Sequence, residues 1–535
     1  MKSVMKNRFA DIPRADIQRS SFDRSHGYKT TFNASDLIPI FVDEALPGDT
    51  FNLNLSAFAR LATPIKPIMD NMYMETFFFA VPNRLLWDNW QKFNGEQRNP
   101  GESTDFLVPQ MEPALYPEFG LGDYFGLPVN RPNIIANALH HRAYNLIWNE
   151  WFRDQNLQDS LTINTGDGPD LLTDYGIKKR GKRHDYFTSC LPFPQKGPSV
   201  EIGIGPTAPI TGIGPVDSDG NNLSMIPSGG VSGNIESTLA ASGGLYVVGS
   251  PSVAVPTIWD TSGLHMDADD PTSTLVADLS QATAITINAL RESFQIQKLY
   301  ERDARGGTRY TEIIKSHFGV TSPDSRLQRP EYLGGGSSPV NISPITQTTQ
   351  SVASGDTPQG NLAAIGTTSF SGHSFTKSFT EHCVIIGLVN VRADLTYQEG
   401  VNRMFSRQTR FDYYWPALSH LGEQEVLNKE IYSDGSAADD EIFGYQERYA
   451  EYRYKPSQIT GQFRSGNPLS LDVWHLSQDF ENLPTLSAEF IEEDVPIERV
   501  VAVPTEPDFI FDSYFKLKCA RPMPAYSVPG LIDHF

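Results

Sequence analysis

Apolar residues recur at every second position along residues 51–55, where Phe51, Leu53 and Leu55 alternate with asparagines. This period of two predicts a half-buried β-strand. Residues 73–81 form a denser apolar run, which is typical of a strand buried on both faces. Four further runs predict core strands, at residues 32–42, 383–391, 500–503 and 509–517.

Helical periodicity is confined to a few segments. Apolar residues follow one helical face along residues 133–153, and residues 281–305 predict a second helix that a pair of glycines ends. Residues 85–93 predict a short helix. Prolines and glycines dominate residues 100–132, and residues 334–374 are rich in Gly, Ser, Thr and Gln, so we expect long surface loops in both segments.

Many short strands, few helices and long loops indicate a mainly β protein, a sandwich or barrel with insertions. We expect the strands of residues 32–81, 383–391 and 500–517 to share one core, although they lie far apart in the chain. The 42 glycines and 38 prolines are spread along the whole chain, as numerous turns require.

Charge is unevenly distributed along the chain. The 43 Lys and Arg residues against 64 Asp and Glu residues leave a net charge of −21, which argues against a protein that neutralises nucleic acid alone. Residues 1–31 are nevertheless basic, whereas residues 197–290 contain nine carboxylates and no Lys or Arg. This asymmetry predicts two surfaces that face different environments.

Two basic segments are candidates for contact with nucleic acid or with neighbouring subunits. The first is an extended N-terminal arm, residues 1–31, whose candidate cations are Lys6, Arg8, Arg14, Arg19, Arg24 and Lys29. Aromatic residues among these cations suit single-stranded nucleic acid, and they equally suit an arm that grips other subunits. The second segment, here called the basic run, contains Lys178, Lys179, Arg180, Lys182 and Arg183. It is interpreted either as a solvated loop or as a contact to phosphate or carboxylate groups.

The motifs that suggest a ligand are incomplete, and we predict no catalytic, cofactor or metal site. Residues 203–208 match a dinucleotide fingerprint, but prolines interrupt the helix that would receive the pyrophosphate. Residues 217–222 resemble the start of a calcium loop without its glycine or its bidentate glutamate. Asp267, Asp269 and Asp270 are interpreted as a solvated acidic tip, and a bound cation there stays open as an alternative.

Histidine and cysteine spacing points to no site either. His140 and His141 are adjacent on a predicted helix and therefore point in different directions. Cys190, Cys383 and Cys519 lie far apart, without the pairing that a disulfide framework or zinc site needs. No apolar run has the length of a signal peptide core or a membrane span, so we expect a soluble protein made in a reducing cytoplasm, without membrane insertion.

Several long motifs occur from the start of the chain to its end: residues 19–26 (RSSFDRSH), 43–50 (DEALPGDT), 79–87 (FAVPNRLLW), 301–310 (ERDARGGTRY), 443–448 (FGYQER) and 529–535 (PGLIDHF). Together they resemble the gokushovirus major capsid protein of the family Microviridae. The resemblance implies a viral jelly roll, an eight-stranded antiparallel β-barrel or sandwich with long loop insertions and a few short helices.

The resemblance also implies a biological role. Sixty copies would form a T=1 icosahedral shell around a circular single-stranded DNA genome, with a small basic DNA-binding virion protein as partner. The protein would be assembled in the bacterial cytoplasm and reside in the virion. Residues 32–196 and 291–535 would form the jelly-roll core, and residues 197–290 an outer protrusion at the threefold axes. Because an outward segment is the first that a receptor meets, we expect this protrusion to contact a host receptor. The competing interpretation is a β-rich carbohydrate-binding or carbohydrate-active protein.

Overall fold

The structure is a computed structural model that describes residues 18–200, 210–211, 276–277, 287–349 and 359–526. The chain divides into two compact units, one formed by Met1–Pro198 with Lys298–Phe535 and the other by Ser199–Gln297. The expected insertion at residues 197–290 overlaps the second unit, of which only short pieces are described.

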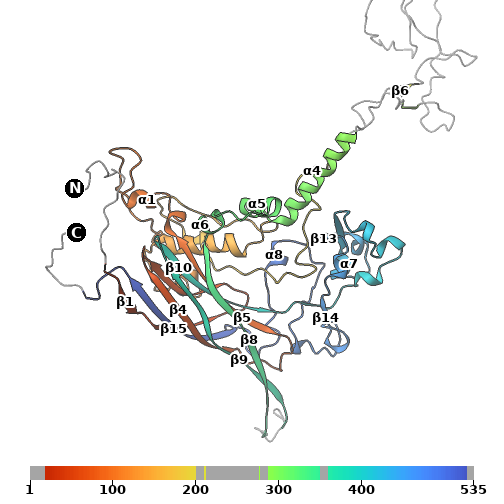
Figure 1. Cartoon of the computed structure of the whole chain (residues 1–535). Helices are drawn as coiled ribbons and strands as arrows, with labels where there is room; N and C mark the ends of the chain where they lie inside the picture. The colour runs from red at the N-terminus through yellow and green to blue at the C-terminus, as the bar shows by residue number, and fades with distance from the viewer. Residues whose placement is uncertain (1–17, 201–209, 212–275, 278–286, 350–358, 527–535) are drawn as a thin grey trace, which may run out of the picture. The chain divides into compact units, whose positions relative to one another are not determined.

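The first unit is built on one antiparallel sheet that curls around a core (Figure 1). The strands follow the order β1-β15-β4-β9-β8-β5-β10-β3, with β2 also paired to β15. Their bounds are β1 Ser20–Asp23, β2 His26–Phe32, β3 Ile38–Ala45, β4 Thr50–Leu61, β5 Met72–Pro82, β8 Glu331–Thr346, β9 Leu362–Ser378, β10 Cys383–Ala393 and β15 Phe509–Arg521.

The pairing of these strands is that of a jelly roll. Because β1 and β2 pair with successive parts of β15, they count as one interrupted strand, which leaves eight strands. The first pairs with the last (β2 with β15), the second with the seventh (β3 with β10), the third with the sixth (β4 with β9) and the fourth with the fifth (β5 with β8). Nested antiparallel pairing of this kind winds a chain into two Greek keys, so the predicted fold class is confirmed.

The interior of the jelly roll is filled by every second side chain of its strands. On β4, Phe51, Leu53 and Leu55 are fully buried, and the residues between them face outward. Phe78 of β5 and Phe515 of β15 close the same core from other strands. Burial of each such side chain contributes about 1.5–3 kcal/mol. The burial of these alternating apolar side chains therefore holds strands together that lie far apart in the sequence.

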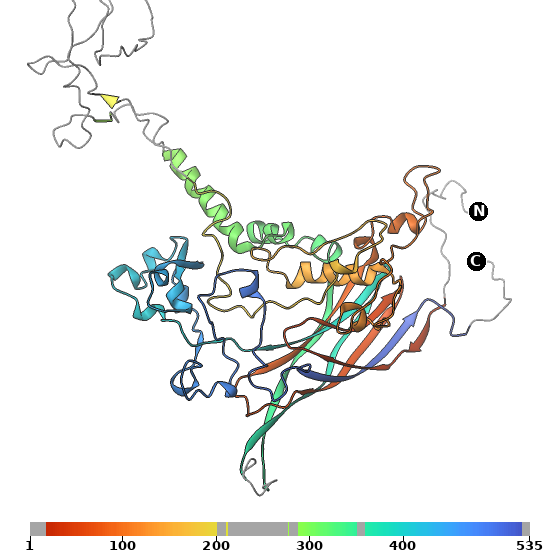
Figure 2. The same cartoon turned by 180° about the vertical axis from the view of Figure 1, so that it is seen from behind.

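Two helices cover one layer of the sheet. Helix α2 (Leu121–Tyr124) contacts β3, and helix α3 (Ala138–Ile147), orange in Figures 1 and 2, contacts β5 and β10. Asn137 begins α3, because its side chain accepts a hydrogen bond of 2.8 Å from the amide of Leu139. The apolar face of α3 then packs on outward-pointing strand residues such as Phe79 and Ile386. A π-helical turn, Trp148–Phe152, continues the helix.

Long excursions connect the strands. A third apolar cluster, which includes Tyr186, Val426 and Phe443, holds the segment between β10 and β15 together. The remaining elements are α1 Trp90–Phe93, α4 Ile287–Gly306, α5 Tyr310–Phe318, α6 Asp324–Leu327, α7 Asn428–Ile431, α8 Ala488–Ile491, β6 Ile210–Thr211, β7 Val276–Ala277, β11 Thr396–Tyr397, β12 Glu423–Leu427, β13 Ile442–Glu447 and β14 Ser457–Gln458, besides short 3-10 turns.

Some local predictions were wrong. The loop expected at residues 334–374 is largely strand, in β8 and β9. Its glycines reflect close packing, since a side chain at Gly335 would meet the carbonyl oxygen of Thr76 on β5. The strand expected at residues 500–503 is reduced to a single bridge between Val501 and Pro64.

Two further boundaries differ from expectation. The segment at residues 85–93 is helical only in α1 and in a preceding 3-10 turn, Asn83–Leu85. The second half of the N-terminal arm is not free, because β1 and β2 pair with β15 and become part of the sheet. Lys6, Arg8 and Arg14 lie outside the described residues.

Candidate functional site

The basic run lies against carboxylates of the jelly roll. Arg180 forms an ion pair with Glu75 of β5, and Arg392 of β10 binds the same carboxylate at 3.0 Å. Arg183 lies 3.6 Å from Glu75 and 3.0 Å from Asp394. Burial would raise the pKa of Glu75, but these guanidinium groups hold it below its ordinary value. The run therefore fastens the segment after α3 to the sheet.

The lysines of the run continue this network. Lys179 forms an ion pair of 2.6 Å with Asp494. Lys182 is buried, and its ammonium group lies 4.5 Å from the ring centre of Phe490. Burial raises the pKa of the nearby Glu493 to about 7, although cations including Arg392 and Lys182 oppose the shift. These contacts pair most cations of the run with carboxylates of the same subunit, and their contact with nucleic acid or with neighbouring subunits stays a prediction.

Among the described residues, one cation of the basic run, Lys178, forms neither an ion pair nor a contact with an aromatic ring. Its backbone instead accepts a hydrogen bond of 2.9 Å from the amide of Leu37 and donates one of 3.0 Å to the hydroxyl of Tyr144. The backbone of Lys178 therefore links the residue that precedes β3 to α3.

The described cations of the arm are also engaged within the subunit. Arg24 forms an ion pair with Asp43 of β3. Lys29 lies 2.6 Å from Asp512 across the β2–β15 pair. Arg19 is exposed and donates a hydrogen bond of 2.9 Å to a threonine at the start of β4. The structure thus brings the arm and β15 together, but it keeps the arm apart from the basic run.

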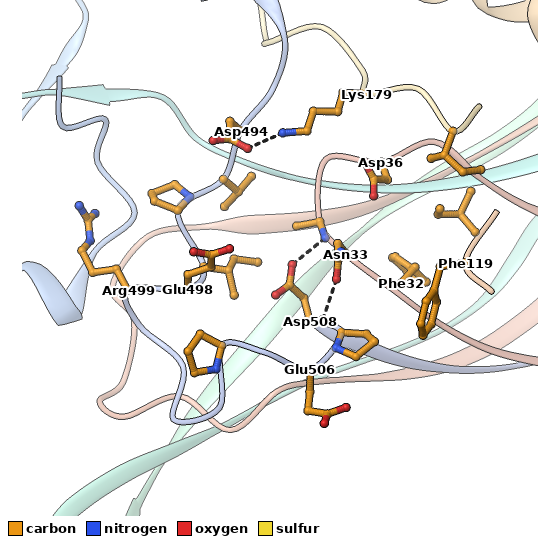
Figure 3. Close-up of a pocket in the computed structure, with 18 of the residues that line it drawn as sticks. Phe32, Asn33, Asp36, Phe119, Lys179, Asp494, Glu498, Arg499, Glu506 and Asp508 are labelled. Atoms are coloured by element: carbon orange, nitrogen blue, oxygen red, sulfur yellow. Dashed lines mark hydrogen bonds and ion pairs between the residues drawn. The ribbon is translucent and has the colours of Figure 1, made fainter. Parts of the chain in front are cut away.

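A cavity of about 830 Å³ has a predominantly acidic wall (Figure 3). Asp36, Glu498 and Asp508 line it, together with the Lys179–Asp494 ion pair. Burial raises the pKa of Asp36 to about 6. Among the described residues no group of three His, Cys, Asp or Glu side chains is placed to hold a metal ion. The carboxylates Asp267, Asp269 and Asp270 lie outside the described residues, as do the motifs at residues 203–208 and 217–222.

The nucleophilic side chains are buried rather than arranged for catalysis. Cys190, Cys383 and Cys519 are free and buried, and burial raises the pKa of Cys383 to about 12. His141 is enclosed by aromatic rings, and burial lowers its pKa to about 4. Its neighbour His140 lies 3.5 Å from Glu44 instead, so the two histidines point apart, as their adjacency predicts.

Sequence reasoning missed a surface rich in exposed aromatic residues, here called the aromatic surface. Phe405 is 74% exposed and Phe411 63% exposed. The other exposed aromatic residues of this surface are Tyr413, Tyr414, Trp415, Tyr452 and Tyr454. The guanidinium group of Arg407 lies 4.3 Å from the ring centre of Tyr452, and that of Arg410 lies 4.5 Å from that of Trp415. The signal was present in the dense run of aromatic residues and arginines at residues 403–415.

Large exposed patches of this composition are unusual on a monomer. Tyr, Trp, Phe and Arg are enriched at the centres of protein interfaces, where they bury large areas with little loss of side-chain entropy. Contiguous exposed apolar area of this kind marks a surface that another macromolecule covers. The aromatic surface is therefore the strongest candidate for a functional surface in the described part of the chain. No helix there is long and apolar enough to cross a membrane.

Comparison with known proteins is consistent with a surface built for association. Residues 10–531 match the family model "Capsid protein (F protein)". The chain is 49% identical to capsid protein VP1 of Bdellovibrio phage phiMH2K, with 98% of each chain covered. It is 47% identical to capsid protein VP1 of Chlamydia phage 1, over 99% of this chain and 98% of the relative. Capsid protein VP1 of Spiroplasma virus 4 is 37% identical, with 96% of each chain covered.

These relatives carry the name of a structural protein of the virus particle, which favours a structural role over the alternative of a carbohydrate-binding or carbohydrate-active protein. The gokushovirus resemblance is confirmed, because all three relatives come from viruses of that group. The chain has the jelly-roll fold, and it matches three such relatives over almost its whole length, so its family can be assigned. The chain belongs to the capsid protein (F protein) family and is a major capsid protein of the Microviridae.

Proposed function

We propose that sixty copies of the chain form a T=1 icosahedral shell that encloses a circular single-stranded DNA genome. The observation that carries this proposal is a capsid-family jelly roll whose surface includes the exposed aromatic residues at positions 405–415. A closed shell requires each subunit to present the same complementary patches to its neighbours, and symmetry multiplies weak contacts into a stable particle. The aromatic surface supplies the apolar anchors that such contacts need.

The genome requires a partner besides this chain. A net charge of −21 per copy cannot neutralise packaged phosphates, so a small basic DNA-binding virion protein is the partner that fits. Assembly would take place in the cytoplasm of the bacterial host, where the buried free cysteines stay reduced. The arm cations Lys6, Arg8 and Arg14 would add DNA or inter-subunit contacts, as would Lys178 of the basic run.

The acidic segment at residues 197–290 would form protrusions at the threefold axes and contact a host receptor. Its nine carboxylates and its lack of Lys and Arg support an outward position, because packaged DNA beside them would set like charges face to face. A map of the particle that placed this segment on the inner surface would contradict this proposal.

Assembly can be tested on full-length protein produced with and without its virion partner. Size-exclusion chromatography and electron microscopy should detect closed particles, and a reconstruction should count the copies. Phe405→Ala and Trp415→Ala should each lower particle yield by at least tenfold, whereas Leu107→Ala, at an exposed site outside the aromatic surface, should leave it unchanged. Circular dichroism separates loss of assembly from loss of folding. Full particle yield from folded variants would contradict the role of the aromatic surface.

A further inference from the structure

One layer of the jelly roll presents a face that carries cations and free aromatic rings, here called the open face. It consists of the outward side chains of β1, β2, β15, β4 and β9. On β15 the burial alternates strictly, so that Tyr514, Lys516 and Lys518 point outward while Phe515 and Leu517 point into the core. The two lysines are about 7 Å apart, the separation of every second residue on a strand.

The neighbouring strand β4 completes the arrangement. Lys516 lies opposite Asn54 and Lys518 opposite Asn52, so each ammonium group has a polar neighbour. Phe58, which is 50% exposed, is one step diagonal from Tyr514, which is 53% exposed. At such a diagonal the two residues are about 7–8 Å apart, so one face of each ring is accessible to a stacking partner. Beyond β4, the β9 residues that pair with outward positions of β4 are serines and threonines, at residues 367, 369, 371, 374, 376 and 378.

Positive charge predominates on the open face, in contrast to the chain as a whole. Its charged residues are the cations Lys29, Arg60, Lys516 and Lys518 and the carboxylates Asp23 and Asp512. Asp512 is paired with Lys29 at 2.6 Å. Within the described residues, Arg60 and Lys516 form no ion pair, and Lys518 has only Asp23 as a neighbour across the β1–β15 pair. A polyanion is the partner that this charge distribution complements.

The opposite layer of the sheet is covered by helices. Helices α2 and α3 contact β3, β5 and β10. The views from both sides show α3, in orange, on that layer (Figures 1 and 2). Within the described part of the chain, the strands β15 and β4 have no such cover. Since strand side chains stand perpendicular to a sheet, the open face forms a flat platform on which an extended chain can lie.

We propose that the open face binds single-stranded DNA, with Tyr514 and Phe58 stacking on bases and Lys516, Lys518 and Arg60 contacting phosphates. This inference rests on the proposed function and names the contact surface for the genome. Stacking of bases on exposed aromatic rings, combined with cations that follow the backbone, is how proteins bind single strands without sequence preference. A shell that packages a whole genome needs this tolerance of sequence.

A second copy of the chain fits the open face less well. Interface centres are depleted in Lys and Ser, and the open face is rich in both, with only two aromatic rings. The aromatic surface at residues 405–415 has the composition of a subunit contact, whereas the open face has that of a nucleic-acid platform.

The stacking contacts can be tested with purified full-length protein and a fluorescein-labelled oligothymidylate, by fluorescence anisotropy. Tyr514→Ala and Phe58→Ala should each weaken binding by roughly 10-fold to 100-fold. Tyr514→Phe keeps the ring and should bind like the wild type. Tyr310→Ala, which removes an exposed ring from α5, is the matched control and should also bind like the wild type. Equal binding by all of these proteins would overturn the proposal.

The phosphate contacts have a separate signature in the dependence of affinity on salt. Lys516→Gln and Lys518→Gln should each lower the slope of log affinity against log salt concentration by about 0.7, while Tyr514→Ala should leave the slope unchanged. Lys315→Gln on α5 is the matched control for charge. Asp512→Asn should strengthen binding, because it removes a carboxylate and releases Lys29. A slope that no lysine variant changes would contradict phosphate contact.

Intact particles separate a failure of this inference from a failure of the proposed function. Wild-type particles without nuclease-protected DNA would refute the proposed function itself. If wild-type particles contain DNA and particles of the Tyr514→Ala, Phe58→Ala double variant retain as much at rising salt, only the open face is refuted. If the double variant fails to assemble while its affinity for the oligonucleotide is unchanged, the open face is a subunit contact and the inference is wrong.

Discussion

Arg142 of α3 donates two hydrogen bonds of 2.7 Å to the carboxylate of Asp170, and both side chains are almost completely buried. Tyr175 donates a third hydrogen bond to Asp170 at 2.6 Å, and Arg142 also binds the carbonyl oxygen of Leu86 at 2.9 Å. Burial would raise the pKa of Asp170, yet these hydrogen bonds hold it below its ordinary value. One ion pair thus joins the helix over the sheet to the loops on both sides of it.

Removing one partner of this pair should destabilise the subunit strongly. We expect Arg142→Leu to lower the free energy of unfolding by about 3–5 kcal/mol, because Asp170 is left as an unpaired buried charge. Lys29→Ala, which breaks an exposed pair, should cost roughly 0–1 kcal/mol. Urea denaturation followed by tryptophan fluorescence measures both. A cost for Arg142→Leu as small as that for Lys29→Ala would show that the pair contributes little.

Glu493 should make stability depend on pH. Its pKa rises from the ordinary value of 4.5 to about 7 in the folded protein. Between these values the folded state holds a proton that the unfolded state has released, so stability should fall as pH rises from about 4.5 to about 7. Glu493→Gln removes this dependence, and its advantage over the wild type at pH 8 should be on the order of 1–3 kcal/mol. Thermal melts of both proteins across this range give the difference, and parallel pH profiles would refute the assignment.

The three cysteines should be unreactive in the folded subunit. Burial raises the pKa values of Cys190, Cys383 and Cys519, so little thiolate exists at neutral pH and access is blocked. We expect no rapid reaction with Ellman's reagent in the native protein and reaction of all three thiols in denaturant. A native thiol that reacts within seconds would show that one of these sites opens.

Gly387 on β10 should tolerate no side chain. A methyl group there would press on the ring of Phe78 and on Phe41, inside the jelly-roll core. Gly387→Ala should therefore destabilise the subunit by about 1–3 kcal/mol through overpacking. Gly27→Ala on β2, where a methyl group would make only an ordinary contact with Ser513, is the matched control in the same denaturation assay. An equal midpoint for the two variants would show that the core yields at Gly387.

The sequence by itself determined where several core strands begin, and β5, β10 and β15 start within two residues of their predicted starts. Alternation identified the strand at residues 51–55 because one of its faces must be buried, and a dense apolar run identified the strand at residues 73–81. It also predicted α3, since that amphipathic helix repeats its apolar face every turn. The capsid family could be named from motifs that span the chain, and the comparisons confirmed it.

Only the tertiary structure decided which charged and aromatic side chains are free. Lys179, Arg180 and Arg183 looked available in the sequence, but their carboxylate partners are hundreds of residues away or on another strand, and folding alone brings them together. The open face was hidden for a similar reason. Lys516 and Tyr514 belong to an ordinary alternating strand, and their neighbours Asn54 and Phe58 become visible only through the β4–β15 register. Sequence spacing reports local periodicity, whereas a surface is set by pairings between distant strands.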